Sequence, residues 1–139
     1  MDTIRLLIVD DEADFRQGTR KALERRGYEV REAGSGAEAI ELVEEERPDV
    51  VLLDLMMPER GGLSTLVALR RDEELRSVPI VVVTGIDQEV HNIYGPDEHF
   101  DATMKRAKHF RPDAYVTKPI DPERLIEVLD ELAPEILTQ

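Results

Sequence analysis

Short apolar runs alternate with amphipathic segments along almost the whole chain. The runs at 4–9, 50–53 and 79–84 consist mostly of Val, Ile and Leu, which is typical of strands buried on both faces of a sheet. We expect five strands, at 4–9, 28–33, 49–53, 79–84 and 114–117. Apolar positions three and four residues apart predict helices at 13–26, at 37–47, around 63–69 and at 121–132. The last helix is expected to begin with Asp121 as its N-cap and Pro122 at its first position.

This alternation of strands and helices predicts a doubly wound α/β fold around a parallel five-stranded sheet. At 139 residues, the chain suits one domain with a substantial core and is short for two. We therefore expect a single domain over 1–139. Its last residues, 134–139, are expected to form a tail that is too short for a separate output domain.

Polar side chains stand at the ends of four of the predicted strands. Asp10 and Asp11 follow the first strand and Asp54 ends the third. Thr84 ends the fourth strand, and Lys118 follows the fifth. Because the carboxyl ends of parallel strands share one edge of a sheet, these groups are expected to meet. Carboxylates so close together repel one another, and a hard cation such as Mg²⁺ relieves that repulsion. A lysine beside them makes sense when an anion such as a phosphoryl group must also be held.

A structural role for the acids is the alternative. Asp10 or Asp11 could cap the helix that begins near residue 13, and Glu12 or Asp14 could complement its dipole. For any one acid, the sequence leaves this alternative open. It does not explain why a carboxylate, a hydroxyl and a lysine also stand at the ends of three other strands.

Composition narrows the classes of partner. Lys and Arg number 18 against 31 Asp and Glu, and the resulting net charge of −13 argues against nucleic acid as the main ligand, because phosphate backbones favour basic surfaces. The absence of cysteine excludes disulfides and thiolate chemistry. No basic start with a cleavage site precedes the first strand, and no apolar stretch approaches the roughly 18 residues of a membrane span. We therefore expect a soluble, cytoplasmic protein without a membrane partner.

Four short motifs surround the strand ends in a fixed order. They are Leu7-Ile8-Val9-Asp10-Asp11-Glu12, Leu53-Asp54-Leu55-Met56-Met57-Pro58 with Gly62 eight residues after Asp54, Val83-Thr84-Gly85, and Tyr115-Val116-Thr117-Lys118-Pro119. Together they resemble the receiver domains of two-component response regulators, over nearly the whole chain. The resemblance implies a flavodoxin-like sheet with strand order 2-1-3-4-5, as in stand-alone chemotaxis regulators. It also implies a cis peptide bond before Pro119.

The resemblance implies a role for each residue of the cluster. Asp54 would accept a phosphoryl group from a sensor histidine kinase or a phosphotransfer protein. Asp10, Asp11 or both would bind Mg²⁺, together with Asp54 and the backbone carbonyl of Met56. The metal and Lys118 would stabilise charge on the transferring group.

Two further residues are implied to act as a switch. Thr84 would hydrogen-bond a phosphoryl oxygen, and Tyr115 would then turn inward. Taken alone, a hydroxyl at a strand end is more often structural and a half-buried aromatic ring more often belongs to the core. The implied function is a phosphorylation-controlled signalling module that switches partner binding. Its chemistry would be limited to its own phosphorylation and dephosphorylation, without turnover of a separate substrate.

The segment between Thr84 and Lys118 is longer than the resemblance implies. Lys118 stands 34 residues after Thr84, about a dozen more than typical receivers use. We therefore expect an insertion or an enlarged helix over 87–112. Within it, helical spacing of apolar residues predicts a helix from about 97 to 109, after a loop or a short helical turn over 87–94.

This helix carries basic residues on an otherwise acidic chain. They are Lys105, Arg106 and Lys108, with Arg111 just beyond. We expect residues 97–111 to bind an output protein that the sequence does not identify. A solvated face on an enlarged helix is an equal alternative.

Other functions stay open from the sequence. The protein could be a phosphorelay intermediate, which passes the phosphoryl group on. From a different class, it could be a phosphatase that forms a phosphoaspartate. Haloacid-dehalogenase-like phosphatases place an Asp-x-Asp pair on the first strand, whereas the two acids here are adjacent. A nucleotide-binding protein is disfavoured, because neither of the glycine-rich phosphate-binding motifs occurs.

Overall fold

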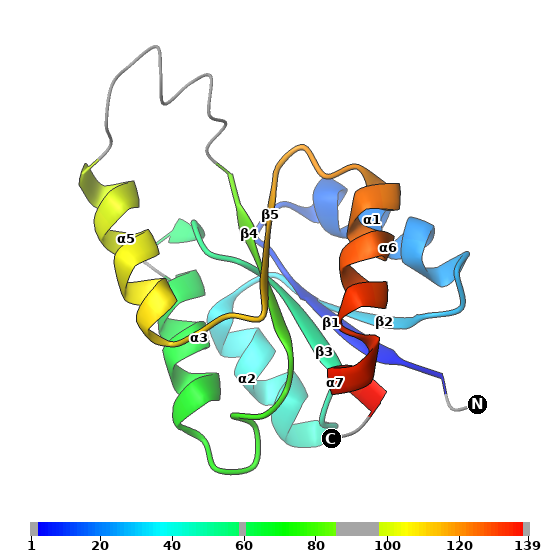
Figure 1. Ribbon diagram of the computed structural model, residues 1–139, viewed down its shortest axis with the longest axis horizontal. Helices are drawn as coiled ribbons and strands as arrows, with labels where there is room; N and C mark the ends of the chain where they lie inside the picture. Colours follow the sequence, from blue (N-terminus) through cyan, green and yellow to red (C-terminus); the bar gives the residue numbers. More distant parts are fainter. Residues whose placement is uncertain (1–2, 59–60, 86–97, 138–139) are drawn as a thin grey trace.

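Five parallel strands form one sheet in the computed structural model, which describes residues 3–58, 61–85 and 98–137 (Figure 1). The strands are β1 (Arg5–Val9), β2 (Glu29–Ala33), β3 (Val50–Asp54), β4 (Ile80–Thr84) and β5 (Ala114–Thr117). Their order is β2-β1-β3-β4-β5. The predicted doubly wound, flavodoxin-like fold and its strand order are therefore confirmed.

Helices cover both faces of the sheet (Figure 1). On one face lie α1 (Ala13–Glu24), α6 (Pro122–Glu131) and α7 (Ala133–Leu137). On the other lie α2 (Gly36–Glu45), α3 (Gly61–Arg71) and α5 (Glu98–His109). None of the described helices is long and apolar enough to cross a membrane.

The sheet is buried on both sides, which explains its continuous apolar runs. In β3, Val51 and Leu53 pack into the core beneath α2 and α3, whereas Val50 and Leu52 pack into the core beneath α1 and α6. All five residues of β3 are buried. Each fully buried aliphatic side chain contributes on the order of 1.5–3 kcal/mol. The central strand is therefore held firmly, and the position of its last residue, Asp54, is fixed.

Two helix starts test the capping expectations. At α6, the Asp121 side chain accepts a hydrogen bond from the Glu123 N–H at 3.0 Å, and Pro122 occupies the first turn, as expected. At α1, the N-cap position is Glu12, and its side chain makes no capping bond. The idea that Asp10 or Asp11 caps α1 is wrong, because Asp10 Oδ1 instead accepts from the Glu12 N–H at 2.8 Å in a tight turn before the helix.

The predicted helix from about 97 to 109 is confirmed as α5. Thr103 and Ala107 are buried, and Met104 and Phe110 pack against the core beneath α3. The predicted loop over 87–94 lies outside the described residues, so the insertion over 87–112 stays a prediction. The expected tail over 134–139 overlaps α7 (Ala133–Leu137), whose Ile136 is buried.

Candidate functional site

Two carboxylates meet at the carboxyl edge of the sheet because β1 and β3 are neighbours. Val9 pairs with Leu53, so the next residue of each strand, Asp10 and Asp54, reaches the edge at the same level. The Asp10 N–H donates to the Ala33 carbonyl at 3.0 Å, which extends the pairing with β2 to the site. Asp10 is completely buried and Asp54 is 4% exposed. The predicted meeting of these carboxylates is present in the structure.

Lys118 reaches the carboxylates from the last strand. The Lys118 N–H donates to the Thr84 carbonyl at 2.9 Å, one residue beyond the pairing of Thr84 with Thr117. Its ammonium Nζ lies 2.8 Å from Asp10 Oδ2 and 3.6 Å from Asp54 Oδ2. One cation thus sits between two buried anions, so the three charges do not cancel.

Two residues that the sequence did not assign to the site complete the surroundings of Lys118. Glu12 Oε1 lies 2.9 Å from Lys118 Nζ. The Phe15 ring lies under the ammonium, with its centroid 4.4 Å from Nζ, which is a cation–π distance. The acidic run Asp10-Asp11-Glu12 was a signal for Glu12. Nothing in the sequence pattern indicated Phe15, because an aromatic ring in an amphipathic helix is ordinarily a core residue.

Burial raises the pKa of Asp54 to about 6. The Met56 N–H, 3.0 Å from Asp54 Oδ1, opposes this shift by hydrogen-bonding the ionised form. Asp10 raises the pKa further, Lys118 lowers it, and Asp11 adds a smaller rise. Asp54 is therefore ionised at neutral pH, but at a cost to the stability of the fold.

The balance of charges is different for Lys118. Its burial disfavours the ammonium form, yet the contacts with Asp10 and Glu12 and the charge of Asp54 outweigh burial. The pKa of Lys118 is consequently raised above its usual range. The residue is a permanent cation at the site.

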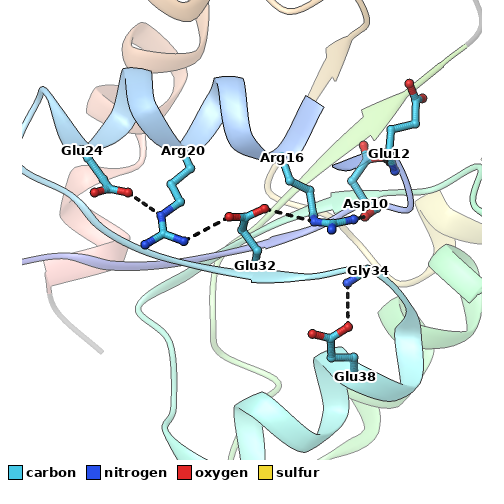
Figure 2. Close-up of polar contacts among 8 residues, drawn as sticks. All are labelled: Asp10, Glu12, Arg16, Arg20, Glu24, Glu32, Gly34 and Glu38. Carbon is cyan, nitrogen blue, oxygen red and sulfur yellow. Dashed lines mark hydrogen bonds and ion pairs between the residues drawn. The ribbon is translucent and has the colours of Figure 1, made fainter. Parts of the chain in front are cut away.

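A chain of ion pairs, joined to Asp10 by a hydrogen bond to its backbone carbonyl, holds this residue in place from the side of α1 (Figure 2). Arg16 donates through Nη1 to the Asp10 carbonyl at 2.7 Å and through Nε to Glu32 Oε1 at 3.2 Å. Arg20 pairs with the second oxygen of Glu32 at 3.1 Å and with Glu24. The start of α1 and the end of β1 are thereby tied to β2, and the sequence pattern gave no sign of this support.

Gly62 permits the close approach of α3 to the site. A Cβ at this position would lie 2.2 Å from the Asp54 carbonyl oxygen and 2.6 Å from backbone atoms of Leu55. Real side chains do not tolerate such contacts, and the atoms they would meet are backbone. Glycine here, part of the motif found in the sequence, is therefore a requirement of the packing of α3 against the end of β3.

The acids can hold a metal ion. The carboxylate oxygens of Asp10, Asp11 and Glu12 lie within 4.8 Å of one another. Asp10 Oδ2 is buried and accepts no well-oriented hydrogen bond from any described residue, although Lys118 Nζ is near. Oxygen donors of this kind suit a hard divalent cation. The set contains Glu12, which was not predicted, and does not contain Asp54.

The remaining predicted residues lie at different distances from the cluster. Thr84 is buried at the end of β4, where the preceding residue, Val83, pairs with Asp54. Met56 contributes its N–H to Asp54. Tyr115 lies on the edge strand β5, three residues before Lys118, and is 39% exposed. Tyr115 therefore faces solvent on the edge strand.

An open pocket of about 600 Å³ lies beside the cluster, between α1 and α6. Its walls are mainly apolar and include Phe15, Leu23, Leu125 and Ile126. Lys118 lines the same pocket, so the pocket adjoins the carboxylates. A partner could therefore approach the site along this groove.

Comparison with known proteins gives one consistent answer. Residues 6–130 match the family model of the response regulator receiver domain. The chain is 32% identical over 126 residues to Protein PilH of Pseudomonas aeruginosa, covering 91% of this chain and 94% of that protein. It is 34% identical over 127 residues to the polar-differentiation response regulator DivK of Brucella ovis, with the same coverage of 91% and 94%.

Solved structures agree with these relatives. The chemotaxis response regulator CheY4 of Vibrio cholerae superposes with a TM-score of 0.78 at 26% identity, covering 94% of this chain and 99% of that one. A CheY-like receiver domain protein from Methanospirillum hungatei JF-1 gives a TM-score of 0.80 at 26% identity, covering 97% of both chains. The similarity thus extends over the whole sheet and its helices.

The charge of Asp54 leads to a prediction about stability. In metal-free buffer at pH 7, Asp54→Asn is expected to raise the free energy of unfolding by on the order of 2–3 kcal/mol, because the pKa of Asp54 is raised from 3.8 to about 6. The folded wild-type chain holds this proton more tightly than the unfolded chain, so its stability falls as pH rises between these values. The gain in the variant should be larger at pH 7 than at pH 5.

Urea unfolding with a chelator present measures this effect. Asp130→Asn, a change at an exposed carboxylate of α6, is the matched control and should change stability little. Mg²⁺ should raise the unfolding midpoint of the wild-type chain more than that of Asp54→Asn, because it relieves the same repulsion. An Asp54→Asn variant no more stable than Asp130→Asn would contradict the electrostatic account.

Proposed function

The chain belongs to the response regulator receiver domain family, and from this premise we propose that it is a phosphorylation-controlled signalling module whose phosphoacceptor is Asp54. The observation that carries the proposal is the position of Lys118, between the buried carboxylates of Asp10 and Asp54. A purely structural pair would need one carboxylate for one lysine. The second carboxylate, which accepts a hydrogen bond from the Met56 N–H at the edge of the sheet, supports a reactive role for Asp54.

The geometry indicates which oxygen of Asp54 attacks. Oδ1 accepts the Met56 N–H, whereas Oδ2 faces Lys118. We assign Oδ2 as the nucleophile. It forms a bond to the phosphorus atom of a phosphohistidine while the phosphorus–nitrogen bond breaks, and the electron pair of that bond returns to the imidazole. The donors are a sensor histidine kinase or a phosphotransfer protein.

The surrounding residues stabilise the transferred group. Lys118 pairs with a phosphoryl oxygen, a role that its permanent charge suits. Asp10 and Asp11, with Asp54 and the Met56 carbonyl, hold Mg²⁺, and the proximity of Glu12 to Asp10 supports adding it through a water molecule. When bound, the ion supplies positive charge to the phosphoryl oxygens.

Thr84 and Tyr115 form the proposed switch. The Thr84 hydroxyl belongs to a buried residue on the strand beside Asp54, within reach of a small movement toward a phosphoryl oxygen. Tyr115 is exposed on the edge strand, so an inward turn would change the surface of β5. Partner binding on that side of the molecule would change with it.

We place the two partners on different surfaces. The phosphodonor docks in the apolar pocket between α1 and α6, because that pocket adjoins Lys118. The output protein, in the cytoplasm, binds residues 97–111 of the proposed insertion 87–112, where Lys105 and Arg106 are exposed. We expect neither surface to bind nucleic acid, because the net charge of the chain is −13 and phosphate backbones favour extended basic surfaces.

Phosphorylation by a small donor tests the assignment of Asp54. Incubation with Mg²⁺ and a small acyl phosphate should add one phosphoryl group to the wild-type chain, and Asp54→Asn should abolish it. Lys118→Met should slow the reaction at least about tenfold, because the cation that stabilises the transferring group is lost. Intact-protein mass spectrometry follows the product, with Asp130→Asn as the control. Modification retained in Asp54→Asn would refute the assignment, and turnover of unrelated phosphate esters would favour a phosphatase.

Gly18 offers a test of the donor pocket. It lines the pocket from α1, and a Cβ there would meet no atom within 4 Å, so a larger side chain fits without disturbing the fold. Gln is also a better helix former than Gly. Gly18→Gln should slow phosphorylation by a histidine-phosphorylated phosphotransfer protein at least about tenfold, because the groove is filled. Its reaction with acyl phosphate should stay unchanged.

Rates from radiolabelled or mass-spectrometric time courses separate the two donors. Ala37, an exposed residue of α2 away from the pocket, gives the control Ala37→Gln. Equal rates for wild type and Gly18→Gln with the protein donor would remove the pocket from the proposal. A fall with both donors would mean that the substitution disturbs the site itself.

Charge reversal tests the output surface. Lys105→Glu with Arg106→Glu should weaken binding of the output protein to the phosphorylated chain about tenfold or more, because both exposed cations become repulsive. The partner is first captured with the phosphorylated chain, using the unmodified chain as the reference, and its affinity is then measured by calorimetry. Lys21→Glu on α1 with Arg26→Glu in the turn after it makes the same change of charge elsewhere. Unchanged affinity in the α5 variant would favour a solvated face.

A further inference from the structure

A second pocket lies at the opposite edge of the sheet from Asp54. It has a volume of about 440 Å³, and its lining includes Arg70, Arg76, His109, Arg111 and Asp113. These residues lie at the C-terminal ends of α3 and α5 and in the segments that lead into β4 and β5, and both helices point these ends the same way (Figure 1). The pocket is basic, although the chain as a whole carries a net charge of −13.

Arg70 braces this pocket from inside. Its side chain is only 12% exposed and donates through Nε to the Phe110 carbonyl at 3.1 Å and through Nη2 to the Arg111 carbonyl at 3.2 Å. Nη2 also pairs with Asp113 Oδ2 at 2.7 Å. Nη1 donates to the carbonyls that precede β4, at residues 76 and 78, at 3.0 and 2.7 Å. One partly buried guanidinium therefore fixes both chain segments that form the walls.

Arg111 is held in an uncommon backbone conformation. Its φ is +51°, a left-handed value that costs a non-glycine residue on the order of 1–2 kcal/mol. Arg111 is nevertheless exposed, so burial of its side chain does not compensate for the strain. A glycine would adopt this turn freely. The presence of arginine here therefore points to a use for its side chain.

Two cations of the pocket form no ion pair with any residue that the structure describes. Within the described part of the chain, no carboxylate lies within ion-pair distance of the Arg76 or Arg111 side chains. Asp113 is the single acid of the lining, and Arg70 and the Ile80 N–H, 2.8 Å away, already occupy it. Cations at the ends of α3 and α5 complement the helix dipoles. That explanation does not extend to Arg76 and Arg111, which lie beyond those helices.

The size of the basic surface indicates which kind of anionic ligand fits the pocket. Beyond the pocket, Lys105, Arg106 and Lys108 continue along the exposed side of α5. A small ligand would not need this extension. A nucleic acid or an anionic membrane would extend beyond these basic residues to the acidic rest of the protein surface. Its negative charges would be repelled by the acidic side chains there, because this repulsion acts over about 8 Å at physiological salt. A short acidic segment matches the length of the basic surface and avoids the acidic one.

We propose that the pocket between the C-terminal ends of α3 and α5 binds an acidic segment of a partner protein, with Arg76 and Arg111 as the residues that pair with its carboxylates. Guanidinium groups suit this task because they bind carboxylates through two parallel hydrogen bonds. The inference rests on the proposed function, because it describes the chemistry by which the output partner is recognised. The binding itself needs no phosphorylation and is measured on the unmodified chain, so its failure is distinct from failure of phosphoryl transfer at Asp54.

Labelled peptides test the proposal by fluorescence anisotropy at low salt. The probes are deca-glutamate and a peptide of alternating Glu and Leu, each with a Gln-for-Glu counterpart. Both acidic peptides should bind the wild-type chain saturably and the Gln peptides should not. Arg76→Ala with Arg111→Gly should weaken binding at least about tenfold, because two charge-assisted contacts are lost. Glycine at 111 fits the left-handed turn, so this variant should unfold at no lower urea concentration than Arg76→Ala alone.

A control variant that loses the same two positive charges elsewhere shows whether binding depends on this pocket. Lys21→Ala with Arg26→Ala removes two exposed cations from α1 and the turn after it, and should change the affinity less than about twofold. An equal loss of affinity in both double variants would overturn the proposal, because binding would then follow net charge alone. Absence of saturable binding by either acidic peptide would also overturn it. The proposal would also be overturned if inorganic pyrophosphate bound through Arg76 and Arg111 while no peptide bound. That result would assign the pocket to small phosphate compounds.

Discussion

The Lys118 ammonium between Asp10 and Asp54 is the interaction on which the site depends. Taking carboxylates out of water is costly, and each additional like charge nearby increases the cost. One lysine, with its charge secured by Asp10 and Glu12, offsets part of that cost and leaves Asp54 with a pKa of about 6. The negative charge of the site is therefore not fully neutralised. A further cation, or the spread of charge into a phosphoryl group, reduces the remaining repulsion between the carboxylates. Reactivity and instability have the same physical origin here.

The helix α3 joins the two edges of the sheet. At its N-terminal end Gly62 packs against the backbone of Asp54, and at its C-terminal end Arg70 holds the segments that lead into β4 and β5. Eleven residues of helix span about 16 Å. The carboxylate site and the basic pocket thus share one rigid element, which close packing of Gly62 fixes at one end and the hydrogen bonds of Arg70 fix at the other.

Several features could be predicted from the sequence because they depend on local patterns. Strands buried on both faces must be almost purely apolar, so β1, β3 and β4 were visible as apolar runs, whereas β2 was visible by its alternation of polar and apolar residues. The carboxyl ends of the predicted strands identified Asp10, Asp54, Thr84 and Lys118. The cap at Asp121 follows from a two-residue signal. The capping role considered for Asp10 or Asp11 was wrong because burial at the sheet edge and the turn to the Glu12 N–H place Asp10 elsewhere.

The sequence by itself determined the fold class, the family motifs and the identity of the charged groups at the strand ends. Only the tertiary structure decided how these groups are paired. It set Glu12 and Phe15 against Lys118, tied Asp10 to β2 through Arg16, and gathered Arg76 and Arg111 around the partly buried Arg70. The physical reason is that burial patterns repeat every two or three to four residues and can be read locally. Ion pairs and pockets join residues up to 106 positions apart, and their distances exist only once the sheet has assembled.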